Sequence, residues 1–236
     1  WRQDGGPLRP RETAETGLRP GAVAAGQDGT LVFGCIDGTV AVRGERERER
    51  SWQAHETRIT SLVCRGDHLW TAAIDGKLRQ WRLSTGELLR DFYDHPAWVA
   101  TVMLSPDGSW IATGCADTMI RTFDTESGDL LQRLEGHGRT PLRLTTDSSG
   151  DRLISSGGFD HELRFWQPDS GRCLMSMGRS QPVTAMAFDP RSGTLALGDR
   201  AGRLRLLRIR PGGPRRFTPR TSPLDTITSP PGSRRH

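Results

Sequence analysis

The chain has 236 residues, of which 34% are hydrophobic and 26% charged, and this composition is typical of one large globular domain or two small ones. No apolar run approaches the roughly 20 residues of a membrane span, and the first residues lack a secretion signal, so we expect a cytoplasmic protein without a membrane partner. The four cysteines contain no Cys-x-x-Cys pair, which disfavours a zinc site.

The net charge of +5 is concentrated near the C-terminus. Residues 211–236 contain five arginines and one acidic residue, so they carry +4 and leave only +1 for residues 1–210. A nucleic-acid-binding domain should show a basic face on the domain itself, and we therefore expect no nucleic-acid partner. Residues 213–236 are rich in Pro, Ser, Thr and Arg, a composition that predicts a disordered basic tail.

Five stretches of eleven residues recur along the chain at nearly constant spacing. They are "FGCIDGTVAVR" (33–43), "TAAIDGKLRQW" (71–81), "TGCADTMIRTF" (113–123), "SGGFDHELRFW" (156–166) and "LGDRAGRLRLL" (197–207). The first four have Asp at the fifth position, and the last has Ala201 there. The last residues of successive stretches are 38, 42, 43 and 41 positions apart. This period indicates a repeat architecture.

Each repeat has the pattern of β structure. Two short apolar or alternating runs flank an "IDG" turn in the first two repeats, which is a strong hairpin signal. A further run precedes each hairpin, as in "ITSLVC", and another follows it, as in "ELLRDF". A single four-stranded sheet cannot bury both of its faces, whereas sheets packed radially around an axis can. We therefore predict an all-β propeller of four-stranded antiparallel blades over residues 1–212.

The repeats resemble those of the WD40 family, in which a Gly-His precedes the first strand, a Ser or Thr lies in the second, an Asp in the turn and a Trp ends the third. The resemblance implies a hydrogen-bonded chain from Asp to His to hydroxyl to indole inside each blade. The residues that match are His55, Thr71, Asp75 and Trp81 in the second repeat, His95, Thr113 and Asp117 in the third, and His137, Ser156, Asp160 and Trp166 in the fourth. Phe123 replaces the Trp of the third repeat.

The recurring His, Ser or Thr, and Asp could also be taken for nucleophilic triads. A catalytic site needs one convergent constellation, however, and this set recurs once per repeat and ends in an aromatic residue. The three histidines are about 40 residues apart, in different blades, which disfavours a shared metal. We therefore expect structural networks and no catalytic residue, metal or cofactor.

The chain is expected to begin inside a repeat. Trp1 lies five residues before Gly6, as Trp81 lies five residues before Gly86, so Trp1 is predicted to end the third strand of an earlier blade. The prediction is thus five blades plus part of a sixth. Because the resemblance implies a ring of seven, we expect a fragment that forms an open arc or a poorly closed ring.

One face of the propeller is the expected functional surface. The resemblance implies that the residue before the turn Asp, and the third and fifth residues after the histidine, point outward there. These positions include an apolar group edged by a cation: Ile36, Arg58, Ile74, Trp98 and Phe159. Such a surface is typical of protein docking sites. We expect a non-enzymatic scaffold that binds a protein or peptide. One alternative is a regulatory or sensor segment of a larger multidomain protein, with or without an enzymatic domain, and another is a propeller enzyme.

Overall fold

The computed structural model describes residues 17–26, 29–44, 49–92 and 95–209, and all regular secondary structure in these residues is β. The first sheet contains β1 (Pro20–Ala25), β2 (Leu31–Cys35), β3 (Thr39–Arg43) and β4 (Arg50–Gln53). The second contains β5 (Ile59–Arg65), β6 (His68–Ala73), β7 (Leu78–Arg82) and β8 (Leu88–Phe92). The third contains β9 (Val99–Leu104), β10 (Trp110–Cys115), β11 (Ile120–Asp124) and β12 (Leu130–Leu134). The fourth contains β13 (Pro141–Thr146), β14 (Leu153–Gly157), β15 (Glu162–Gln167) and β16 (Arg172–Gly178). The fifth contains β17 (Val183–Asp189), β18 (Thr194–Asp199) and β19 (Leu204–Arg208).

The predicted all-β class and the four-stranded antiparallel blades are confirmed. Neighbouring strands in each sheet are consecutive in the chain and antiparallel, as expected for hairpin-linked blades. The fifth sheet has three strands within the described residues, and its predicted fourth strand falls beyond them. The predicted sixth-blade residues Trp1–Gly6 and the tail 213–236 also lie outside the described residues. None of the described segments forms a helix long and apolar enough to cross a membrane.

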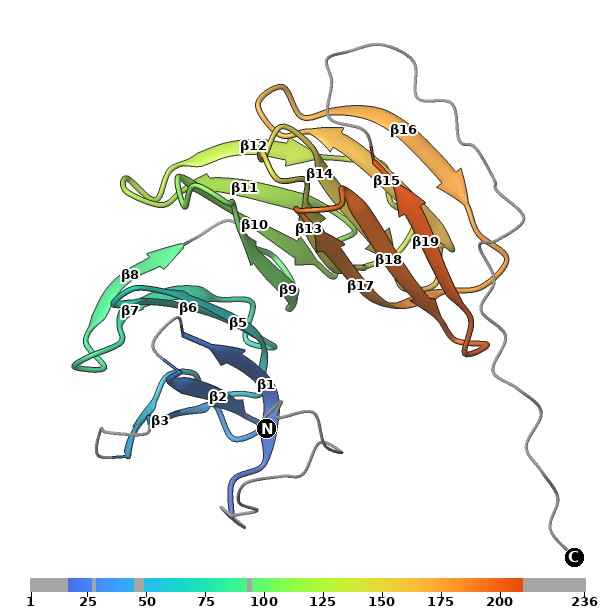
Figure 1. Cartoon of the computed structure of the whole chain (residues 1–236). Helices are drawn as coiled ribbons and strands as arrows, with labels where there is room; N and C mark the ends of the chain where they lie inside the picture. The colour runs from blue at the N-terminus through green and yellow to red at the C-terminus, as the bar shows by residue number, and fades with distance from the viewer. Residues whose placement is uncertain (1–16, 27–28, 45–48, 93–94, 210–236) are drawn as a thin grey trace, which may run out of the picture.

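The five sheets follow one another along an arc (Figure 1). The first strand of each sheet contacts the first strand of the next, in the order β1, β5, β9, β13 and β17. This is the radial arrangement predicted from the repeat, in which one strand of every blade lies near the common axis.

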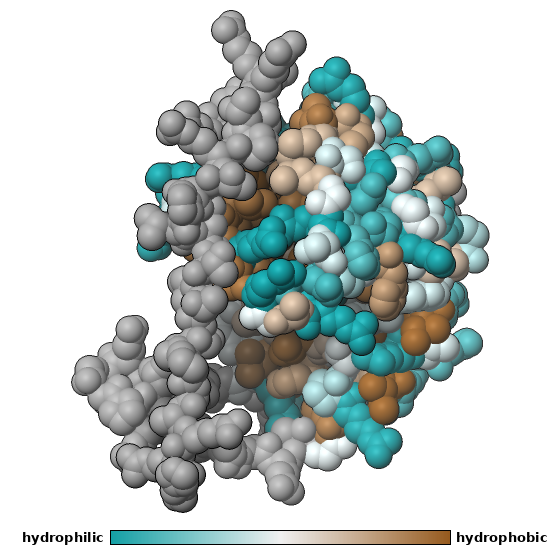
Figure 2. Space-filling model, turned by 90° about the vertical axis from the view of Figure 1, so that its right-hand side faces the viewer, coloured by the Kyte–Doolittle hydropathy of each residue, from teal (hydrophilic) through white to brown (hydrophobic). Residues whose placement is uncertain are grey.

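The core consists of apolar layers between successive sheets. Trp81 of the second sheet packs with Val32 and Val40 of the first, and Trp166 of the fourth packs with Ile120 of the third. The central strands are buried on both faces, as in Leu153–Gly157, where every residue is buried. Among the described residues, the last sheet has a neighbouring sheet on only one of its faces, and Leu204 and Leu206 are each 42% exposed. On this side of the molecule, apolar side chains are interspersed among polar ones (Figure 2).

The turn between the second and third strands of a sheet explains the recurrent Asp. In the first four sheets the Asp carboxylate accepts a hydrogen bond from the backbone N–H two residues later, at 3.0–3.2 Å. The residue between them adopts a left-handed conformation, with φ of 85° at Gly38 and 77° at Gly76. Thr118 and His161 adopt it as well, with φ of 74° and 57°. The turn is therefore held by the Asp side chain even where glycine is missing.

Candidate functional site

The second sheet contains the predicted hydrogen-bonded chain. The ring of His55 lies 2.9 Å from Asp75 through Nδ1 and 2.7 Å from the Thr71 hydroxyl through Nε2. The indole N–H of Trp81 donates to the same hydroxyl at 2.9 Å. With a neutral ring, Nδ1 donates to the carboxylate and the hydroxyl donates to Nε2. Burial raises the pKa of Asp75, but its hydrogen bonds, above all the one with His55, and the nearby charge of Arg79 outweigh burial and leave this pKa lowered.

The fourth sheet contains an equivalent chain, with one correction to the prediction. Nδ1 of His137 lies 2.6 Å from Asp160, and Nε2 lies 2.7 Å from a serine hydroxyl that also accepts from Trp166 at 2.7 Å. That serine is Ser155, and the prediction of Ser156 was wrong. Ser156 instead donates to the carbonyl of its neighbour Gly157 at 3.3 Å.

The cause is the hairpin between β14 and β15, in which paired residues are one position further apart than in the hairpin between β6 and β7. Ser155 pairs with Arg164 on β15, as Thr71 pairs with Arg79 on β7. The residue with the hydroxyl and the Trp are eleven positions apart in the fourth sheet and ten positions apart in the second. Since successive residues of a strand face opposite sides, counting back from Asp160 selects the wrong serine. Counting back from Trp166 does not identify the serine either, because the sequence does not show how long the connection between the two strands is.

The third sheet keeps only part of the predicted chain. His95 contacts the Thr113 hydroxyl through Nε2 at 2.8 Å, and its ring lies 5.4 Å from the ring of Phe123. The Asp117 carboxylate does not hold His95 as predicted but pairs with Arg121 at 2.6 Å. Arg121 is buried, and a buried guanidinium needs a counter-charge. Burial raises the pKa of Asp117, and the hydrogen bond from Arg121 outweighs it, so this pKa is lowered.

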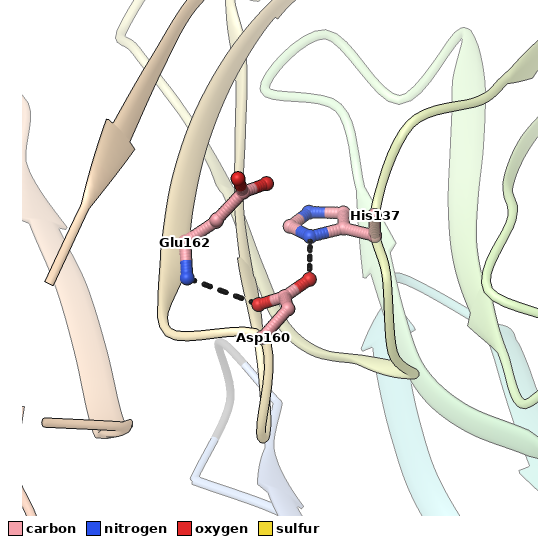
Figure 3. A group of neighbouring side chains, drawn as sticks. All are labelled: His137, Asp160 and Glu162. Atoms are coloured by element: carbon pink, nitrogen blue, oxygen red, sulfur yellow. Dashed lines mark hydrogen bonds and ion pairs between the residues drawn. The ribbon is translucent and has the colours of Figure 1, made fainter.

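His137, Asp160 and Glu162 bring their ligand atoms within 4.8 Å of one another (Figure 3). Each group already has a protein partner: both ring nitrogens of His137 are engaged, and Glu162 pairs with Arg164 at 2.6 Å. Burial lowers the pKa of His137, and the partly opposing effect of Asp160 does not restore it. Because both ring nitrogens already have protein partners, the neutral imidazole of His137 stabilises the blade and offers no free nitrogen to a metal ion.

A pocket opens on the face that the sequence predicted, between the second and third sheets. Its volume is about 420 Å³, and we call it the rim pocket; its lining is Arg58, Thr60, Ile74, Trp98 and Ala100. Arg58, Ile74 and Trp98 were predicted to lie together, and the structure brings them together. Thr60 and Ala100 are the fifth residues after His55 and His95, the other outward positions of the pattern.

Backbone contacts hold the lining in place. The N–H of Ile74 donates to the carbonyl of Arg58 at 3.1 Å, and the N–H of Ala116 donates to the carbonyl of Trp98 at 2.9 Å. The Thr60 hydroxyl contacts the carbonyls of Ala72 and Val99 and so ties the second sheet to the third. Ile74 is 48% exposed and Trp98 38% exposed. The pocket therefore presents apolar side chains to solvent on a rigid frame.

Two predicted docking residues lie outside this lining. Ile36 is 41% exposed, and its N–H donates to the carbonyl of Arg19 at 2.9 Å, so it occupies the equivalent position in the first sheet. In the fourth sheet the equivalent bond, 3.0 Å to Thr140, is made by Gly158. Phe159 is the additional residue of the longer connection and is 69% exposed. The prediction that Phe159 is equivalent to Ile74 was wrong because of the same additional hairpin residue that led to the wrong choice of Ser156.

These radially packed sheets with their internal Asp–His–hydroxyl–Trp chains define a repeat-built β-propeller. The family model "WD domain, G-beta repeat" matches residues 86–124 and 128–167. The chain carries WD40 repeats and has the fold of the WD40-repeat family. A chain in the crystal structure of the mitotic checkpoint complex superposes with a TM-score of 0.79 over 89% of this chain and 69% of that one, at 18% identity.

Curated relatives are similar over parts of their length. An uncharacterized WD repeat-containing protein of Schizosaccharomyces pombe is 30% identical over 53% of this chain and 34% of its own. COMPASS component SWD3 of Saccharomyces cerevisiae is 27% identical over 48% of this chain and 35% of its own. Protein groucho of Drosophila melanogaster is 26% identical over 69% of this chain and 22% of its own. The chain thus spans about a third or less of these relatives. WD40 repeats generally mediate protein–protein interactions, and their propellers are generally non-enzymatic scaffolds.

Proposed function

We propose that the chain is a non-enzymatic scaffold that docks a short segment of a partner protein in the rim pocket. The observation that supports this most is the meeting of an exposed Trp98, an exposed Ile74 and the guanidinium of Arg58 around one opening. Within the described residues Arg58 makes no ion pair, so its charge is available to a partner. Trp and Arg are enriched among the residues that contribute most to binding at protein interfaces.

The dimensions and chemistry of the rim pocket favour a peptide segment. A volume of about 420 Å³ lies in the range of sites that accept one or a few side chains rather than a folded domain. The lining contains no carboxylate, histidine or cysteine, so it offers recognition and not acid–base or nucleophilic chemistry. Because backbone hydrogen bonds already order Ile74 and Trp98, little conformational entropy is lost on binding.

The test is a selection of peptides against the immobilised chain. A random peptide library is selected on the wild-type protein and counter-selected on Trp98→Ala, and the enriched peptides are measured by fluorescence polarisation. Phe159→Ala is the matched control, because it removes an exposed aromatic outside the rim pocket. We expect Trp98→Ala to weaken binding at least tenfold and Phe159→Ala to leave it unchanged. Equal affinity for Trp98→Ala and wild type, with both folded by circular dichroism, would falsify docking at this pocket.

We also propose that the protein acts in the cytoplasm. The support is that all four cysteines are free thiols, as expected in a reducing compartment. Burial, the largest influence, raises the pKa of both Cys35 and Cys115 and so keeps these thiols protonated and unreactive. Fractionation of cells that express the tagged chain tests this, and recovery of the chain with the secreted fraction would contradict it.

A further inference from the structure

An arginine recurs on the third strand of the blades, two residues before the closing aromatic position. Arg79 on β7 pairs with Asp91 at 2.7 Å, and Arg121 on β11 pairs with Asp117 at 2.6 Å. Arg164 on β15 pairs with Glu162 at 2.6 Å. Each of these half-buried or buried guanidinium groups thus has a carboxylate of its own blade as its counter-charge.

The fifth sheet keeps this arginine but not its carboxylate. Arg205 on β19 pairs with Leu197 on β18, as Arg79 pairs with Thr71. It lies on the same side of β19 as Leu207, which packs against the layer shared with the fourth sheet. Arg205 is only half-exposed, yet it forms no ion pair or hydrogen bond through its side chain with the described residues.

A second cation replaces the histidine of this blade. Arg179 lies four residues before the start of β17, as His55 lies four residues before the start of β5. The hydroxyl and indole that such a histidine would meet are replaced by Leu197 and Leu207. The N–H of Arg179 is fixed by the carbonyl of His161 at 2.6 Å, but its guanidinium has no partner among the described residues.

The register of the blade places Arg205 near Arg179. In the second sheet the equivalent Arg79 donates to the carbonyl of Ala54, the residue before His55, at 2.6 Å. Arg203 contacts the Ser180 hydroxyl, next to Arg179, at 3.3 Å, and it pairs with Asp199 at 2.9 Å. That carboxylate is therefore already used by Arg203. Burial and then the charge of Arg205 lower the pKa of Arg179, while Asp199 opposes them. Three cations thus share one carboxylate, an arrangement that an added anion would stabilise.

We propose that Arg179 and Arg205 bind a phosphate group, free or carried on a phosphorylated side chain, on the side of the fifth sheet that faces the fourth. Two planar guanidinium forks match the tetrahedral oxygens of phosphate and can each donate two hydrogen bonds. A dianion also balances both charges, whereas a carboxylate balances one. The Ser180 hydroxyl, beside Arg179, is a further donor next to this site.

The experiment uses the 236-residue chain in phosphate-free buffer at constant ionic strength. Calorimetric titrations use inorganic phosphate, acetate, a five-residue glycine peptide with a central phosphoserine, and its unphosphorylated counterpart. The variants are Arg205→Gln and Arg179→Gln, and the control is Arg208→Gln, which removes an exposed arginine from the opposite side of β19. We expect each of the first two to weaken phosphate or phosphopeptide binding at least tenfold and the control to leave it unchanged.

The titrations distinguish free phosphate from a phosphorylated side chain. Saturable binding of inorganic phosphate as tight as that of the phosphopeptide supports a free ligand, and binding of the phosphopeptide alone supports a modified partner. In buffer without phosphate, Arg205→Gln should have a melting temperature equal to or above that of wild type, because a repulsion is removed. The proposal is overturned if neither probe binds saturably, if acetate binds as well as phosphate, or if Arg208→Gln loses as much affinity as Arg205→Gln.

Discussion

Ser155 accepts a 2.7 Å hydrogen bond from the indole of Trp166 while its Oγ also contacts Nε2 of His137 at 2.7 Å. Loss of this hydroxyl would leave two buried polar groups without their partner. We expect Ser155→Ala to lower the free energy of unfolding by about 1–3 kcal/mol. Ser156→Ala is the matched control and should cost less, since its bond to Gly157 is 3.3 Å long. Urea denaturation measures both; equal losses would contradict the assignment of Ser155.

Removal of the turn carboxylate should matter most where it holds a buried histidine. Asp160→Ala leaves Nδ1 of His137 without its acceptor, and we expect a cost of about 1–3 kcal/mol. Asp37→Ala removes hydrogen bonds to Thr39 but leaves no buried histidine without its acceptor, so it should cost less. The two variants are compared by thermal and urea unfolding. The scheme fails if both shift the melting temperature equally.

The buried His137 predicts a loss of stability in weak acid. Its pKa in the folded protein lies below the usual 6.5, mainly because of burial. As the pH falls below 6.5, the unfolded chain binds the proton first, so the free energy of unfolding decreases until the folded pKa is reached. We expect the urea midpoint to fall between pH 7 and pH 5.5. His137→Gln should make this slope shallower, and an unchanged slope would show that His137 is not a source of it.

The lowered pKa of Asp75 acts in a separate, more acidic window. A carboxylate whose folded pKa lies below the usual 3.8 stabilises the fold above that value, and this contribution is lost as the pH falls through the folded pKa. We expect an additional loss of stability below about pH 4 in wild type, with a smaller loss in Asp75→Asn. Denaturation at pH 5 and pH 3 separates this window from that of His137. An identical decline in both proteins would exclude Asp75 as its source.

Thr118 is a β-branched residue in the left-handed region, with φ of 74°. Such a residue is strained there, and glycine is not. We expect Thr118→Gly to raise the free energy of unfolding by about 1 kcal/mol. The reciprocal change Gly76→Ala, at φ of 77° and with a new Cβ 3.1 Å from the carbonyl of Ala97, should lower it by a similar amount. Thermal unfolding of both tests the turn geometry, and a stabilising Gly76→Ala would contradict it.

Much of the architecture is readable from the sequence because it repeats. The 41-residue period, the "IDG" turns and the alternating runs are local patterns, and they predicted the four-stranded sheets and their radial packing. Counting from His55 and His95 placed Arg58 and Trp98 beside Ile74, since equivalent positions of successive blades share one face. A repeat transfers geometry from one blade to the next without knowledge of long-range contacts.

Tertiary structure decided what depends on a single loop length or on charges from different strands. The hairpin that joins β14 to β15 has one additional residue between its last paired residues. This residue places Ser155 instead of Ser156 in the hydrogen-bonded chain and moves Phe159 out of register. The pairing of Asp117 with Arg121 followed from the burial of that guanidinium. Arg205 and Arg179, which precedes β17, are placed on one side of the fifth sheet by the pairing of its strands. Inter-strand hydrogen bonds set the register of a strand, and the sequence does not show them. An excess of positive charge likewise appears only where packing brings several arginines together.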